Sequence, residues 1–274
     1  KFYKLKDVNS TDILELLKQV DTKFCNDRAK RVRSILNLIF TSAFEENLSD
    51  KNLFTMQILK NHKFKRKPIK TKAYSVSEMK IILNNSSGWL KIFFELSFKC
   101  GLRTGECMGL KWSDFNFDNG YFKVQRSISK GHITESSELI HENKNHLRNI
   151  YLFPETLNLL KKYSNFKPND EWLFVTKTGE PFMQCDTIRN YHIKPFLKKI
   201  GVEYKAVYAT RRTYVSIMKQ SEKILIEDIQ DVVGHKKGSK ITDKHYNLDV
   251  LENSHQVKKA EEKAKVFNDI LSMA

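Results

Sequence analysis

Helical spacing of apolar residues dominates the first part of the chain. In residues 1–62 it runs over residues 10–20, over residues 28–46 and, more weakly, over residues 53–59. Ser10 is expected to cap the first helix. The second helix should bury one face, made of Val32, Ile35, Leu36, Ile39 and Phe40. These patterns predict a small helical unit.

Residues 74–274 mix helical and strand patterns and predict a larger unit. Ser75 or Ser77 can cap a first helix, and residues 89–100 form a strongly apolar one. Strands are expected at residues 121–126, 149–153 and 172–176, with a polar turn around Gly131 after the first. The predicted fold class is mainly α with a small antiparallel β-sheet.

Residues 63–73 separate the two units and have no apolar periodicity. They contain one proline, which favours an exposed linker. A basic linker can be solvated or can lie along a DNA backbone, and its composition favours neither interpretation. The basic residues that would bind DNA are Lys63, Lys65, Arg66, Lys67, Lys70 and Lys72 here, with Arg212 in the larger unit.

Charge narrows the class of partner. Lys plus Arg is 48 and Asp plus Glu is 32, a net charge of +16. This excess favours nucleic acid first and an anionic membrane surface second. A proteome that is basic throughout is the plainer interpretation, but it does not explain residues 51–72, where eight basic residues occur and no acidic one.

Other classes of protein are disfavoured. No run of about 18 or more apolar residues could span a membrane. The four cysteines form no C-x-x-C pair and no cluster with metal-ligand spacing, so we expect free thiols, a reducing compartment and no metal. The chain starts at Lys1 without a leader, and we expect a fragment of a longer, cytoplasmic bacterial protein.

Four segments carry candidate chemistry, and each is a weak signal alone. Arg103 lies near a helix start, where the macrodipole disfavours a cation, which suggests a bound anion. An ion pair with Glu106 is the alternative. Taken singly, a lysine on a turn is usually a solvated residue. The segments are Gly101–Phe115 with Arg103 and Glu106, Asn143–Leu152 with Lys144, Tyr208–Ser216 with Arg211, and Val233–His235 followed by Tyr246.

The order of these segments resembles the tyrosine recombinase family (phage integrase, Xer-like). That family reads approximately G-L-R-x-x-E, K-x-x-x-R, H-x-x-R and L-G-H, with a tyrosine shortly afterwards. The resemblance covers almost the whole chain. It implies a two-domain, C-shaped clamp around duplex DNA, with a core-binding domain at residues 1–62 and a catalytic domain at residues 74–274.

Phosphodiester chemistry explains the residue types. Arg103 and Arg211 can hold the phosphoryl oxygens of a transition state that gains negative charge. The resemblance makes Tyr246 the nucleophile that forms a 3′-phosphotyrosine, a form of covalent catalysis. Lys144 would protonate the leaving 5′-oxygen, which becomes a 5′-hydroxyl.

Two further members of the candidate site have supporting roles. His235 can bind a phosphoryl oxygen, and Glu106 can hold Arg103 or His235 in place. The exchange of one phosphodiester for another needs no cofactor and no metal.

One position departs from the family pattern, because Tyr208 stands where H-x-x-R has histidine. A phenol can donate to a phosphate oxygen but cannot accept a proton near pH 7. His245 or water could accept it instead, and a catalytically inactive relative is the other interpretation. Tyr214 is a further candidate nucleophile, for which we expect packing in the core.

The tail from about residue 250 to residue 274 predicts one more helix. Its apolar residues recur at spacings of three and four, at Val257, Ala260, Ala264, Phe267 and Leu271. It can pack on its own domain. The resemblance implies instead that it docks on a neighbouring subunit.

The predicted function is site-specific recombination that integrates or excises a mobile element. The implied partners are double-stranded DNA with a specific recombination site and further copies of the chain, as a nucleoid-associated tetramer on two sites. Alternatives are a type IB topoisomerase-like enzyme, a DNA-binding relative without catalysis, and a basic scaffold for acidic proteins.

Overall fold

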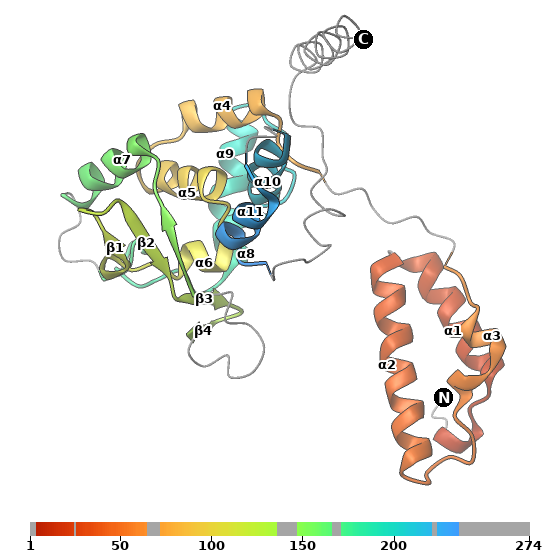
Figure 1. Cartoon of the computed structure of the whole chain (residues 1–274). Helices are drawn as coiled ribbons and strands as arrows, with labels where there is room; N and C mark the ends of the chain where they lie inside the picture. Colours follow the sequence, from red (N-terminus) through yellow and green to blue (C-terminus); the bar gives the residue numbers. More distant parts are fainter. Residues whose placement is uncertain are drawn as a thin grey trace, which may run out of the picture. The chain divides into compact units, whose positions relative to one another are not determined.

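A computed structural model gives the structure, which divides into two compact units, Lys1–Lys70 and Thr71–Ala274 (Figure 1). The expected C-shaped arrangement of the two units stays a prediction. The described residues are 4–24, 26–64, 72–135, 147–165, 171–220 and 224–235.

Two helices that pack against each other, α1 (Ser10–Lys23) and α2 (Asn26–Glu45), dominate the first unit. A single turn of 3₁₀ helix at Leu53–Thr55 and the short α3 (Gln57–Lys60) follow. The core consists of Ile13, Leu17, Phe40, Leu53, Phe54 and Leu59.

The predicted cap of α1 was wrong by one residue. The Asn9 side chain accepts hydrogen bonds from the backbone N–H groups of Thr11 and Asp12, and Asp12 accepts one from the Asn9 backbone. This reciprocal capping box uses two donors that the helix leaves without partners, which is why the helix begins after Asn9.

The predicted buried face of α2 was partly wrong. Phe40 is buried, but Ile35 is 57% exposed and Ile39 is 44% exposed. The buried positions of α2 include Ala29, Phe40 and Ala43, which form a narrow stripe. Since α2 packs against α1 and the 53–55 turn, isoleucines beside that stripe stay uncovered.

Helices of the second unit surround α5, against which α4, α6, α7 and α10 pack. In Figure 1 the strands lie on one side of α5, and α9 and α10 on the other. The helices are α4 (Val76–Asn85), α5 (Gly88–Lys99), α6 (Thr104–Met108), α7 (Pro154–Ser164), α8 (Cys185–Ile188), α9 (Lys194–Lys199), α10 (Ala209–Gln220) and α11 (Ile226–Val233). Ser75 caps α4 in a capping box with Glu78, as expected.

The strands form two small antiparallel sheets, which confirms the predicted fold class. One sheet has the order β1-β2-β5, and the other is the hairpin β3–β4. Phe122 of β2 pairs with Ile150 of β5, and both are buried. The strands are β1 (Phe115–Asn116), β2 (Tyr121–Val124), β3 (Arg126–Ser129), β4 (His132–Glu135) and β5 (Arg148–Tyr151).

Two details of the strand prediction differ from the structure. The polar turn around Gly131 joins a hairpin, in which Lys130 and Gly131 both have positive φ, as a type I′ turn requires. The expected strand at residues 172–176 is wrong. It makes only the isolated bridges Lys111–Trp172 and Val175–Pro181, because the segment pairs with a loop rather than with another strand.

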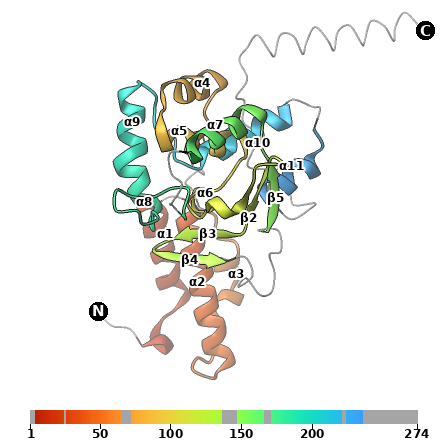
Figure 2. The ribbon, with the colours of Figure 1, turned by 90° about the vertical axis from the view of Figure 1, so that its left-hand side faces the viewer.

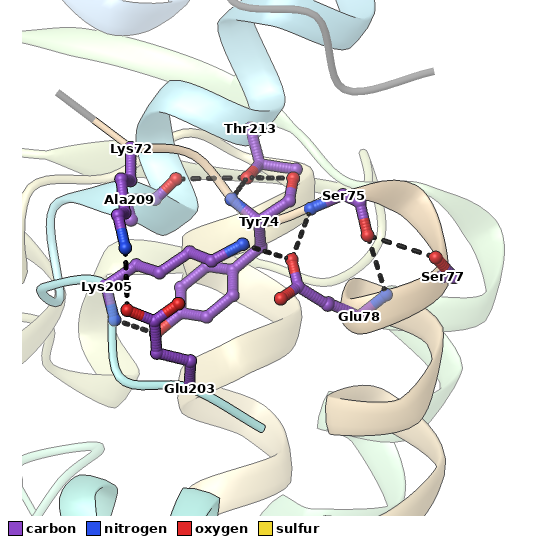
Figure 3. Close-up of polar contacts among 9 residues, drawn as sticks. All are labelled: Lys72, Tyr74, Ser75, Ser77, Glu78, Glu203, Lys205, Ala209 and Thr213. Atoms are coloured by element: carbon purple, nitrogen blue, oxygen red, sulfur yellow. Dashed lines mark hydrogen bonds and ion pairs between the residues drawn. The ribbon is translucent and has the colours of Figure 1, made fainter. Parts of the chain in front are cut away.

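The start of the second unit is fixed to α10, the helix that carries Arg211. The Thr213 hydroxyl accepts from the Tyr74 backbone N–H at 2.8 Å and lies 2.9 Å from the Tyr74 carbonyl oxygen (Figure 3). Lys205 donates to Glu78 at 2.6 Å and its backbone N–H donates to the Tyr74 phenol. These contacts surround the buried ring of Tyr74 and hold the chain where it enters the unit.

None of the helices in the described parts of the chain has the length and apolar character needed to cross a bilayer.

Replacing Thr213 by valine tests this attachment. Thr213 is fully buried, so Thr213→Val keeps the shape and leaves the Tyr74 backbone groups without their partner. We expect the free energy of unfolding to fall by about 1–3 kcal/mol. Urea titration followed by tryptophan fluorescence reports on this unit alone, because Trp89, Trp112 and Trp172 all lie in it. Thr213→Ser keeps the hydroxyl and is the control; equal losses for both variants would contradict the assignment.

Candidate active site

Arg211 is the centre of the candidate site and is fully buried in the first turn of α10. Its guanidinium donates to the Gly101 carbonyl at 2.8 Å and to the Val233 carbonyl at 2.5 Å. Its Nε has no hydrogen-bond partner among the described residues. A buried guanidinium with one N–H donor that lacks an acceptor raises the free energy of the folded state unless an anion binds there. The geometry therefore favours an anion site.

Gly101 explains why the first motif begins with glycine. It follows the end of α5 with φ +60°, in the left-handed region that glycine adopts without strain. A Cβ there would lie 2.6 Å from the Tyr214 ring. Glycine therefore lets α5 end against α10 and presents its carbonyl to Arg211.

Glu106 connects two further arginines. Its carboxylate accepts from the Arg103 guanidinium at 2.7 Å and from the Arg103 backbone N–H at 2.8 Å. Arg148 donates to both carboxylate oxygens, at 3.1 and 3.0 Å. The ion pair expected as an alternative role for Arg103 is thus present, but the Arg103 side chain remains 31% exposed while that of Glu106 is 3% exposed.

The charge state of Glu106 follows from these neighbours. Burial alone would raise the pKa of its carboxyl, but Arg148, Arg103 and Arg211 together lower the pKa to about 2. Glu106 is therefore a carboxylate at neutral pH. Among the described residues, three guanidinium groups then surround one carboxylate, which leaves a net positive charge at the site.

His235 lies where α11 ends. Gly234 adopts a left-handed conformation with φ +64°, and the His235 backbone N–H donates to the Gln230 carbonyl at 2.9 Å. This is the Schellman pattern that closes helices at glycine. The Gly-His pair of the motif is thus a helix ending that places the imidazole beside Arg211.

The His235 ring lies with Nε2 3.0 Å from an Arg211 guanidinium nitrogen. Burial and then the positive charges of Arg211, Arg103 and Arg148 lower the pKa of His235 to about 4. The ring is therefore neutral at pH 7. Because a guanidinium can only donate, Nε2 accepts, and the ring proton belongs on Nδ1. His235 is then a hydrogen-bond donor through Nδ1.

The Tyr208 ring contacts both arginines of its motif. The Arg212 guanidinium carbon lies 5.2 Å from the ring centroid, and that of Arg211 lies 5.8 Å away. Tyr208 thus lies beside the buried cation, where the family pattern has histidine.

Tyr214 is 7% exposed, and burial raises the pKa of its phenol to about 12. Both observations agree with the expected packing role in the core, because a phenol of this kind is a poor nucleophile.

Several predicted site residues lie outside the described residues. These are Lys144, His245 and Tyr246, the linker residues Lys65, Arg66, Lys67 and Lys70, and the tail at residues 250–274. The structure therefore brings together Arg103, Glu106, Arg211, His235 and Tyr208. The structure adds Arg148 to this set. In the sequence, Arg148 was noted only as the final arginine of the K-x-x-x-R motif.

Basic residues of the first unit line a pocket of about 860 Å³. Lys63 is exposed there and lies with Lys30, Arg33 and Lys60 around Phe54 and Phe64. In the second unit, Lys72 pairs with Glu203 at 2.6 Å, and both side chains are more than half exposed.

Within the described residues, no group of three or more His, Cys, Asp or Glu side chains could hold a metal ion.

Comparison with known proteins places this site in a family. A model of the phage integrase family matches residues 72–250. A protein of Caldanaerobacter subterraneus subsp. tengcongensis described as "Tyrosine recombinase XerC-like" is 26% identical over 231 residues, 75% of this chain. The chain spans 58% of the length of that relative.

Solved structures share the fold. A Tn1549 transposon integrase in complex with a circular intermediate DNA has a TM-score of 0.72 at 16% identity, over 94% of this chain and 86% of the other. A lambda integrase dimer bound to a core site has a TM-score of 0.62 at 19% identity, over 88% and 65%. XerA recombinase has a TM-score of 0.55 at 18% identity, over 95% and 85%. Since the family model covers more than half of the sequence, the chain belongs to the phage integrase family.

Proposed function

We propose that this chain is a site-specific tyrosine recombinase that cleaves and rejoins DNA through a 3′-phosphotyrosine on Tyr246. The observation that carries the proposal is the buried Arg211, whose Nε lacks a partner in the described part of the chain while Arg103 and His235 converge beside it. This cluster suits one phosphodiester. Two structural neighbours are integrases bound to DNA, which supports the same substrate class.

The proposed reaction conserves the number of phosphodiester bonds. The Tyr246 oxygen attacks the phosphorus, a 3′-phosphotyrosine forms, and the bond to the 5′-oxygen breaks. Lys144 delivers a proton to that 5′-oxygen. Attack by a 5′-hydroxyl on the phosphotyrosine reverses each step and rejoins the strand.

Charge stabilisation is the main task of the described residues. Arg211 and Arg103 bind the non-bridging oxygens, on which negative charge grows in the transition state. His235 donates through Nδ1, because its ring is neutral and its Nε2 already accepts from Arg211. Tyr208 donates its phenol hydrogen to a phosphoryl oxygen, and the proton of Tyr246 passes to His245 or water.

DNA contacts outside the reacting phosphate would come from basic residues in and around the segment that joins the units. We assign backbone contacts to Lys63, Lys65, Arg66, Lys67, Lys70, Lys72 and Arg212, in a chain with a net charge of +16. We also propose that the DNA substrate belongs to a mobile element, because one structural neighbour is a transposon integrase in complex with a circular intermediate DNA. The proposal also includes a location in the bacterial cytoplasm, at the nucleoid.

Covalent capture tests the function. We would incubate the protein with a pool of nicked duplexes of randomised sequence, denature it, and recover and sequence any DNA that stays attached. The expected adduct disappears in Tyr246→Phe, because phenylalanine lacks the attacking oxygen. Tyr214→Phe is the matched control and should keep the adduct, since Tyr214 is a buried tyrosine that packs on Gly101.

Each result separates two hypotheses. Duplexes that bind without any adduct would support a non-catalytic DNA-binding protein. An adduct together with relaxation of supercoiled DNA that contains no matched pair of sites would favour the topoisomerase-like alternative.

The neutral state of His235 predicts a pH dependence of stability. The unfolded ring titrates near 6.5 and the folded ring near 4, so only the unfolded state binds the proton between these values. The free energy of unfolding of the second unit should therefore fall as the pH drops from 6.5 towards 4. His235→Gln should make that decline shallower in urea titrations of the DNA-free protein; an unchanged slope would contradict a neutral His235.

Assembly is proposed to depend on the tail, with a tetramer on two DNA sites. Deleting residues 255–274 should leave the affinity for one duplex unchanged and abolish higher complexes in sedimentation velocity. Aggregation or unfolding of the shortened chain would instead show that the tail packs on its own domain.

A further inference from the structure

We propose that Arg148 is a positioning residue of this site, which orients Arg103 through Glu106 and His235 through the end of α11. The expected effect of Arg148 on catalysis rests on the proposed function. The structural part of the inference rests on three sets of contacts that meet at one residue.

The first contacts join Arg148 to Glu106. Two guanidinium nitrogens donate to the two carboxylate oxygens, and the side chains are 8% and 3% exposed. A bidentate pair of this kind fixes the orientation of the carboxylate as well as its position. Glu106 uses the same two oxygens to hold the backbone and the guanidinium of Arg103. The direction of Arg103 therefore depends on Arg148.

The second contact joins Arg148 to α11. Its Nε donates to the Val232 carbonyl at 2.6 Å, in the last turn of the helix. Carbonyls in a last turn lack helical partners, and a cation there is favoured by the macrodipole. Arg211 takes the next carbonyl, that of Val233. The two arginines thus fix the helix end from which His235 projects.

The third contact is made by the backbone. Arg148 begins β5 and pairs with Val124 of β2, and β5 lies beside α11 (Figure 2). The guanidinium thereby links a strand of the β1-β2-β5 sheet to α6 and α11, which are far apart in the sequence. Lysine could supply the charge at this position, but its three donors share one nitrogen and lack the fixed fork by which three guanidinium nitrogens reach Glu106 and Val232.

These contacts also show why Arg148 differs from the two arginines assigned to the phosphate. All three of its nitrogens donate to protein groups, whereas the Arg211 Nε has no partner among the described residues and Arg103 is 31% exposed. Arg148 therefore acts through its neighbours rather than on the substrate.

Arg148→Lys is the variant that separates geometry from charge. With a duplex recovered in the covalent capture, we expect its dissociation constant to stay close to the wild-type value. Adduct formation at saturating protein should be slowed by roughly 100-fold, because small misplacements of catalytic groups have effects of this size. Adduct formation at the wild-type rate would overturn the proposal.

Arg126→Lys is the matched control. Arg126 is 9% exposed, pairs with Asp114 and Glu135 and donates to the Gly109 carbonyl, and none of these partners is a site residue. It should lose stability to a similar extent and keep its adduct rate. Equal slowing of both variants would show that loss of a buried ion pair, rather than positioning, slows the reaction.

A measurement on the wild-type protein needs neither a folded variant nor a cleavable duplex. We would follow the arginine Nε–H signals by NMR during titration with inorganic phosphate. The signal of Arg148 should stay in place, because it is bonded to Val232, while that of Arg211 should shift. A shift of Arg148 as large as that of Arg211 would place Arg148 on the anion and overturn the positioning role. Because this test involves no cleavage, it can support or overturn the positioning role of Arg148 even if no covalent adduct ever forms.

Discussion

The ionised carboxylate of Glu106 is the constraint on which the candidate site depends. It is almost fully buried, and a buried charge is tolerated only with partners of opposite charge and well-formed hydrogen bonds. Arg103 and Arg148 supply both, and Arg211 adds a third positive charge nearby. One carboxylate allows these arginines to approach one another but does not cancel all of their charge. The net positive charge that remains is what a phosphodiester would neutralise.

Ends of helices, rather than their faces, build this site. Arg103 lies just before α6, Gly101 just after α5, and His235 just after α11. Carbonyls at the ends of helices have no partner within the helix, and Arg148 and Arg211 take those of Val232 and Val233. Arg211 therefore satisfies the backbone and also belongs to the proposed anion site, while Arg148 satisfies the backbone and holds Glu106, so packing and electrostatics depend on each other here.

The sequence predicted most of the local features, such as helices, and fewer of the features that depend on contacts between distant parts of the chain. Helical spacing identified α4 and α5 because their patterns are strong, and Ser75 with Glu78 formed the expected capping box. Ile35 and Ile39 were assigned to the core because spacing gives the side of a helix but not how much of it a small unit covers. The segment 172–176 looked like a strand because extended backbone favours the same residues, whether it pairs with a strand or with a loop. The site shows the same limit: the K-x-x-x-R motif marked Arg148 but gave no role for it, since Glu106 and Val232 come to it from distant parts of the chain.

The position of Arg148 in the chain suggests why one side chain would hold these particular elements together. Lys144 precedes Arg148 by one short segment, and Tyr246 follows His235 by another. The proposed proton donor and the proposed nucleophile are thus attached to β5 and to the end of α11, the two elements that Arg148 joins. The order of the motifs in the sequence then has a physical meaning, because each proposed reacting group follows or precedes, by a short stretch of chain, a residue that is held at the site.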